Sequence, residues 1–221
     1  MTSVLDPKLI KKELSRFMRN NDVFSTTTRG VTTGTTTGTY SSASTHLIAI
    51  ATIKNIRSIV VGGVTLTYGT DYEYQEDYSD AGTLKCKITY VSAQTGDYTV
   101  TYDSGADKIY PDLPQETLSI SQFPRIGIEM IGEDSEDSDA DGSVELTTIT
   151  FSIYVYDQDA DNIDDYIKVI KQKFIANKKS FYNLRYVRKI RVGPLLPFPP
   201  GKRKVFFKAV DFISPLNEES V

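Results

Sequence analysis

Residues 147–158 read TTITFSIYVYDQ, and this stretch decides the fold predicted for the second half of the chain. Ile149, Phe151, Ile153 and Val155 alternate with threonine, serine and tyrosine. Successive side chains of a strand point to opposite faces, so the alternation predicts a strand with one apolar face and one polar face.

Further elements are predicted on both sides of this strand. One strand is expected at about 117–131, and two more at about 182–192 and 204–213. An N-terminal helix begins after Asp6, and a second helix, capped by Asp161, follows the alternating strand. The expected fold is therefore α+β, a mostly antiparallel sheet packed on two helices in the order α-β-β-α-β-β.

An all-β module, sandwich-like in character, is predicted to be inserted at 46–110, where short strands alternate with turn signals. Eight of the 14 tyrosines lie between Tyr68 and Tyr110. Tyr72 and Tyr74 fall on one strand face, which favours packing between strands over a ligand platform. A carbohydrate-binding or receptor-binding module remains the alternative for this segment.

The predicted domains are a core at 1–45 plus 111–221 and the inserted module at 46–110. Within the core, residues 25–44 are dominated by threonine, glycine and serine. This composition predicts either a long mobile arm or an edge hairpin, and no chemistry is assigned to it.

Composition argues against several functional classes. Cys86 is the single cysteine and His46 the single histidine, so a disulfide within the chain and a cysteine-based zinc site are excluded. The N-terminus carries charges where a secretory signal would be apolar, and the apolar window at 47–53 is too short to span a bilayer. We expect a soluble protein made inside a cell, with no cofactor and no membrane partner.

Two acidic runs resemble catalytic or metal sites. The loop at 132–142 has the spacing that begins a calcium loop, but Thr148 stands where a bidentate glutamate is needed. A solvated hairpin tip is the favoured interpretation. The acids at 157–165 lie at a helix start, where capping explains them. We therefore predict no metal site and no enzyme, with a hydrolase using Asp139 or Asp159 as the weaker alternative.

The net charge of −4 hides a strong asymmetry. Residues 60–147 contain 18 acids and 4 bases, whereas residues 162–221 contain 13 bases and 5 acids. Arg185, Lys189 and Arg191 are predicted to share one strand face, which indicates a contact with acids or phosphates. The candidates for a subunit contact or a DNA-facing surface are Arg185, Arg188, Lys189, Arg191, Lys202, Arg203 and Lys204.

The loop at 193–201, GPLLPFPPG, places apolar side chains among prolines. Leu195, Leu196 and Phe198 are predicted either to dock a partner protein or to pack on the loop's own sheet.

The order of these segments resembles a known family. QFPRIGIEMIGE at 122–133, an acidic loop, TTITFSIYVYDQ, an amphipathic helix and a strand pair are similar to tail terminator (tail completion) proteins of long-tailed bacterial and archaeal viruses. The inserted segment resembles the small β modules appended to virion neck and tail proteins. Head-completion stoppers are related neck proteins and remain an alternative.

The resemblance implies a virion structural protein assembled in the host cytoplasm. It implies a homo-oligomeric ring, a homohexamer, that caps the tail tube and joins it to the head. The expected partners are other copies of the chain, the tail tube protein and head-completion or neck proteins. DNA is expected to pass through the lumen without sequence specificity, and the basic residues are expected at that lumen or at the subunit contact.

Overall fold

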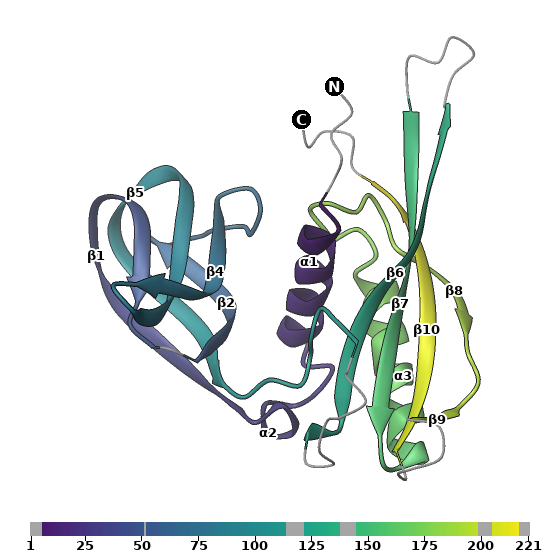
Figure 1. Cartoon of the computed structure of the whole chain (residues 1–221). Coiled ribbons are helices and arrows are strands. Elements are labelled where there is room, and N and C mark those ends of the chain that lie inside the picture. Colours follow the sequence, from purple (N-terminus) through teal and green to yellow (C-terminus); the bar gives the residue numbers. More distant parts are fainter. Residues whose placement is uncertain (1–5, 51, 114–121, 138–144, 199–204, 217–221) are drawn as a thin grey trace. The chain divides into compact units, whose positions relative to one another are not determined.

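The computed structural model describes residues 6–50, 52–113, 122–137, 145–198 and 205–216 (Figure 1). Contacts within the chain divide it into two compact units. Unit 1 consists of Met1–Phe24 and Lys108–Val221, and unit 2 of Ser25–Asp107. The Thr/Gly-rich segment at 25–44, assigned to the core in the sequence-based domain prediction, thus belongs by its contacts to unit 2.

The predicted α+β fold class is wrong, because the chain is largely β. Among the described residues, strand accounts for 57% and helix for 20%, in two mostly antiparallel sheets with three helices. Two long strands contribute to this β content. The Thr/Gly-rich segment, predicted to be a mobile arm or an edge hairpin, forms most of an 18-residue strand, β1 (Val31–Ile48), and the predicted all-β module ends in a 23-residue strand, β5 (Thr83–Gly105).

Unit 1 contains one antiparallel sheet, in the strand order β6-β7-β10-β8, with β9 also pairing with β10. The strands are β6 (Arg125–Asp137), β7 (Glu145–Asp157), β8 (Arg188–Val192), β9 (Leu196–Phe198) and β10 (Val205–Pro215). The helices are α1 (Pro7–Asn20) and α3 (Ala160–Ala176). Asp6 caps α1 as predicted, but Asp159, not Asp161, caps α3.

Helices α1 and α3 pack on one face of this sheet. Ile149, Phe151, Ile153 and Val155 of β7 are buried in the core that they share with the helices, which confirms the predicted alternation. The rings of Phe17 in α1 and Phe174 in α3 meet with centroids 4.7 Å apart. The opposite face of the sheet, which we call the open face, therefore carries the polar side chains of β7.

A buried carboxylate joins α1 to the segment that leads into β8. Glu13 is only 6% exposed and accepts hydrogen bonds from the backbone N–H groups of Tyr182 and Asn183 and from the side-chain amide of Asn183. Because these donors lie in an irregular segment, Glu13 takes the place of a strand partner there. The contact anchors the segment before β8 to α1.

Unit 2 is a five-stranded sheet in the order β1-β5-β2-β3, with β4 also pairing with β5. Its other elements are α2 (Thr26–Arg29), β2 (Ile53–Val61), β3 (Val64–Thr65) and β4 (Tyr72–Asp80). Tyr72 and Tyr74 are 0% and 2% exposed, which confirms that these tyrosines pack between strands.

Glycines allow two further tyrosines to lie flat on β1. A Cβ at Gly34 would come within 2.8 Å of the Tyr102 ring, and one at Gly38 within 2.7 Å of the Tyr98 hydroxyl. Contacts that short do not occur between real side chains. The glycines of the predicted arm are thus positions where an aromatic ring covers the backbone of a strand.

A buried ionic network connects α2 to the end of β5. Arg29 is fully buried, donating from Nη1 to Asp103 at 2.9 Å and from Nε to Asp107 at 3.0 Å. Asp103 also accepts from Arg57, Thr33 and Asn55. Burial alone would raise the pKa of Asp103, but hydrogen bonds from Arg57 and Arg29 outweigh burial and lower it.

Candidate functional site

One row of open-face residues crosses all four main strands of unit 1. Glu129 of β6 is opposite Ser152 of β7, Ser152 is opposite Asp211 of β10, and Asp211 is opposite Arg191 of β8. We call these four residues the polar row. Its acid-hydroxyl-acid-cation order runs from one terminal strand of the sheet to the other.

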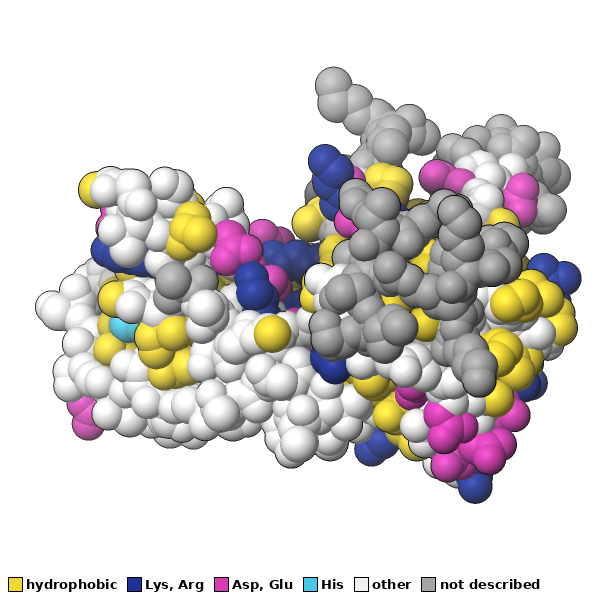
Figure 2. Space-filling view, turned by 60° about the horizontal axis from the view of Figure 1, so that its bottom comes forward, with side chains coloured by type: hydrophobic (Ala, Val, Ile, Leu, Met, Phe, Trp, Pro, Cys, Tyr) yellow, Lys and Arg dark blue, Asp and Glu magenta, His cyan; other side chains and the backbone are white. Residues whose placement is uncertain are grey.

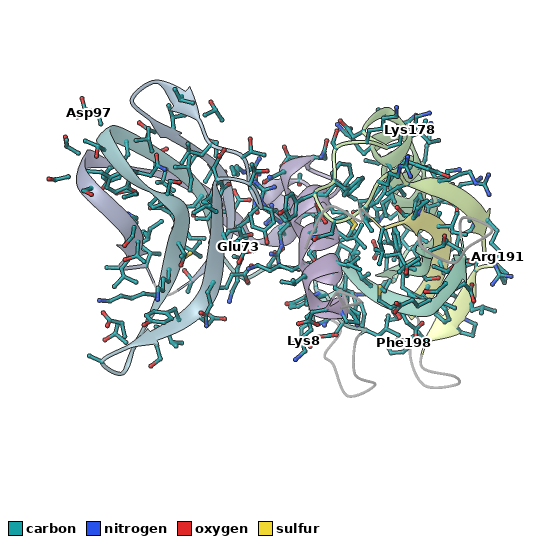
Figure 3. All side chains as sticks on the ribbon, turned by 90° about the horizontal axis from the view of Figure 1, so that it is seen from above. Lys8, Glu73, Asp97, Lys178, Arg191 and Phe198 are labelled. Atoms are coloured by element: carbon teal, nitrogen blue, oxygen red, sulfur yellow. The ribbon has the colours of Figure 1, made fainter. Side chains whose placement is uncertain are left out.

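Asp211 is the centre of the polar row. Its carboxylate accepts from the Ser152 hydroxyl and from Arg191 Nε, and the carboxylate side chain is only 8% exposed. The Arg191 side chain is 76% exposed, and its hydrogen bond to Asp211 raises the pKa of the guanidinium. Figure 3 shows Arg191 at the outer edge of unit 1. Arg191 therefore pairs within its own sheet while much of its side chain faces solvent.

Tyr154 connects the polar row to an aromatic group. Its hydroxyl donates to Glu129 Oε2 at 2.8 Å, and its pKa is raised to about 12 by burial and by that carboxylate. Its ring lies 6.3 Å from that of Tyr156, which contacts Phe207 and Phe198 at 5.5 Å and 5.1 Å. The open face is thus polar in its middle and aromatic toward β9.

The basic terminal strand differs from its prediction. Arg185 lies before β8, and its backbone N–H donates to the Pro215 carbonyl. Within β8 a register shift at position 190 interrupts the alternation, so Arg191 is opposite Asp211 whereas Lys189 is opposite Phe212. The three cations therefore do not share one strand face as predicted. Arg185, Arg188 and Lys189 are all exposed.

The other terminal strand is acidic. β6 pairs with β7 along its whole length and ends in the sequence GEDSED at 132–137. Glu133 and Asp134 are exposed. The sheet of unit 1 thus has acids on one terminal strand and bases on the other.

The predicted docking residues divide between the two interpretations. Leu195 and Leu196 are 39% and 43% exposed. Phe198 is half-buried in the aromatic group of its own sheet, at the position labelled in Figure 3. Lys202, Arg203 and Lys204, the other basic candidates, lie outside the described residues.

The two acidic runs of the sequence, at 157–165 and 132–142, form no metal site among the described residues. Asp157 accepts from the backbone N–H groups of Gln158 and Asp159, and Asp159 caps α3, so these acids bind backbone at a helix start. Asp139 and the rest of the calcium-like loop from 138 to 142 lie outside the described residues. In the described part of the chain, no group of three or more histidine, cysteine or acidic side chains could hold a metal ion.

No family model matches the chain, and no curated protein matches it. Of the helices described, none has the length and apolar character needed to cross a membrane.

Proposed function

We propose that this chain is a non-enzymatic structural protein of a virion, which forms a ring at the head-tail junction, terminates the tail tube and connects it to the head. The observation that carries the proposal is the opposite charge of the two terminal strands in the sheet of unit 1. The similarity of its segment order to tail terminator proteins supports the same proposal.

Strand directions make an edge-to-edge contact possible. Each neighbouring pair in the order β6-β7-β10-β8 is antiparallel, so β6 and β8 also run in opposite directions. If β8 of one copy lies beside β6 of the next, the sheet continues as an antiparallel sheet across the contact. Such a head-to-tail contact uses two different surfaces, and it produces a ring when the rotation closes.

Charge selects this contact over other pairings. The exposed Arg188 and Lys189 on β8 would meet the exposed Glu133 and Asp134 on β6 of the next copy. Pairing β8 with β8, or β6 with β6, would bring like charges together, which costs several kcal/mol at an interface. If these bases instead face the lumen of the ring, they would attract the DNA backbone without sequence specificity.

Charge reversal tests the proposal. Replacing Arg188 and Lys189 together with glutamate is expected to weaken ring assembly by more than about tenfold, because two attractive contacts become repulsive at every junction. Mass photometry at low salt measures the fraction of chains in rings. The control reverses Lys178 and Lys179, which are also exposed but lie outside β8, and should leave assembly unchanged.

A compensating exchange separates charge pairing from simple damage. Mixing the reversed protein with a second variant, Glu133→Lys with Asp134→Lys, is expected to restore the junction in which the new acids meet the new bases. Equal loss of assembly in the Lys178 and Lys179 control, or no recovery in the mixture, would contradict the edge contact.

A further inference from the structure

The first strand of unit 2 has an edge without the usual protection against pairing. Strand β1 is terminal in its sheet, and in the described part of the chain it pairs with β5 alone. Its 18 residues include no charged residue and no proline. Exposed edges normally carry such residues because an unprotected edge binds other strands. On the face shown in Figure 2, unit 2 presents a broad area without charged or apolar side chains.

Hydrogen bonds of β5 show which peptide groups of β1 point outward. Gly105 donates to Thr52, and Asp97 accepts from Gly62, so the odd-numbered residues of this part of β5 turn their peptide groups away from β1. Their partners, from Val31 to Thr39, must then turn their own peptide groups toward the free edge. Thr33, Thr35, Thr37 and Thr39 thus offer N–H and C=O groups to a further strand, and all four are exposed.

The sequence of this edge is symmetric. Residues 33–39 read TGTTTGT, which is the same in both directions about Thr36. Two copies of the edge, placed antiparallel about a two-fold axis at Thr36, match Thr35 with Thr37, Thr33 with Thr39 and Gly34 with Gly38. Each matched odd-numbered pair has outward peptide groups on both strands, so each can exchange two hydrogen bonds.

We propose that β1 is a homodimer contact, in which the edge at 33–39 pairs with the same edge of a second copy about a two-fold axis at Thr36. The absence of charge removes the repulsion that would oppose self-pairing, and threonine pairs opposite one another are favourable in antiparallel sheets. The regular pairing of β1 with β5 is interrupted only beyond Tyr40, so no register shift interrupts the edge at 33–39.

This contact is independent of the proposed ring. The ring contact lies in unit 1 and depends on charge, whereas the β1 contact lies in unit 2 and contains no charged residue. Raising the salt concentration should therefore weaken the first contact and leave the second unchanged. A failure of either proposal can be recognised without reference to the other.

Cysteine cross-linking tests the two-fold axis directly. In the proposed dimer the two Thr36 residues form a non-hydrogen-bonded pair, with Cα atoms about 4.5 Å apart. This separation is within the range of about 4.4–6.8 Å that a disulfide spans. Under mild oxidation in high salt, Thr36→Cys is expected to give a disulfide-linked dimer, seen on non-reducing gels. The native Cys86 is buried and can remain in place.

The matched control is Thr39→Cys on the same strand. It is more exposed than Thr36, but its symmetry mate lies far along the strand in the proposed register, so no dimer is expected. Equal cross-linking of both variants, cross-linking of Thr39→Cys alone, or none in either variant would overturn the proposal.

A second variant tests the hydrogen bonds. Thr37→Pro removes an outward N–H and leaves the β1-β5 hydrogen bonds in place, so the dimer should weaken by at least about tenfold. Thr37→Val keeps the N–H and should dimerise normally. Circular dichroism verifies that both variants fold, and sedimentation in high salt measures the dimer. Equal dimerisation of the two variants would contradict strand pairing at this edge.

Discussion

Replacing Arg29 with methionine is expected to lower the free energy of unfolding of unit 2 by about 3–5 kcal/mol. The side chain is fully buried between Asp103 and Asp107, so the substitution leaves two buried carboxylates without their shared cation. Arg57 and Asn55 still bond to Asp103, whereas the ion pairs of Arg29 with Asp103 and Asp107 are lost. Urea unfolding followed by tyrosine fluorescence measures the change.

The control for this substitution is Lys54→Met. Lys54 forms a partly exposed ion pair with Asp77, at 3.0 Å in the same unit, and such pairs contribute about 1 kcal/mol or less. If the Arg29 variant loses no more stability than the Lys54 variant, the buried network does not hold α2 to β5.

Lowering the pH is also expected to destabilise the buried network, through protonation of Asp103. The pKa of Asp103 is lowered in the folded chain, so the stability that its ionised form contributes is present above the usual aspartate range. That stability is lost as the pH falls through the lowered pKa. The stability of the Arg29 variant is therefore expected to depend less on acid than that of the natural chain.

Removing the Glu13 carboxylate is expected to cause the second large loss in the free energy of unfolding. Glu13→Ala is expected to cost on the order of 3 kcal/mol, because the substitution leaves the two buried donors of Asn183 and the partly buried backbone N–H of Tyr182 without this acceptor. Hydrogen exchange should show faster exchange at the amides of 182 and 183, and chemical unfolding should show the loss of stability.

The comparison variant is Glu73→Ala in unit 2, an exposed glutamate whose replacement should change stability by about 0.5 kcal/mol or less. If the Glu13 and Glu73 variants behave alike, Glu13 does not anchor the segment that leads into β8. Ring assembly provides a second measurement, because a displaced β8 would also move Arg188 and Lys189 from the edge.

Local patterns predicted the parts of the structure that depend on local physics. The alternation from Ile149 to Val155 identified the buried face of β7, and the helix-starting acids identified both helices of unit 1 to within two residues. The spacing of Tyr72 and Tyr74 identified two residues of the unit 2 core. In each case the sequence pattern and the structure that it predicts lie within a few residues of each other.

The fold class was mispredicted in part because the segment at 25–44, predicted to be a mobile arm or an edge hairpin, forms most of one long strand of unit 2. A segment rich in threonine and glycine is too polar to indicate a core, and threonine favours extended backbone with or without a partner strand. The glycines become interpretable only when Tyr98 and Tyr102 of β5 are known to cover them. That information comes from the register of β1 against β5, which the sequence of the arm does not contain.

The other features that the sequence did not predict depend on contacts between residues far apart in the chain. The register shift in β8 follows from its pairing with β10, so the sequence of the strand alone suggested a continuous alternation from Arg185 to Arg191. Arg29 finds Asp103 at a sequence separation of 74, and Glu13 finds Asn183 at 170. No pattern within either segment indicates these partners. A lone arginine in an uncharged segment, such as Arg29, does suggest that an acidic partner lies elsewhere in the chain.

Mass photometry of the purified chain across a salt series, with negative-stain imaging of the same samples, tests whether the charged edges of unit 1 join copies into a ring. We expect closed rings at low salt that dissociate as salt rises, leaving smaller species joined through the uncharged β1 edge. Particles no larger than this dimer at every salt concentration, both alone and with the tail tube added, would contradict the claim that the charged edges of unit 1 join copies into a ring.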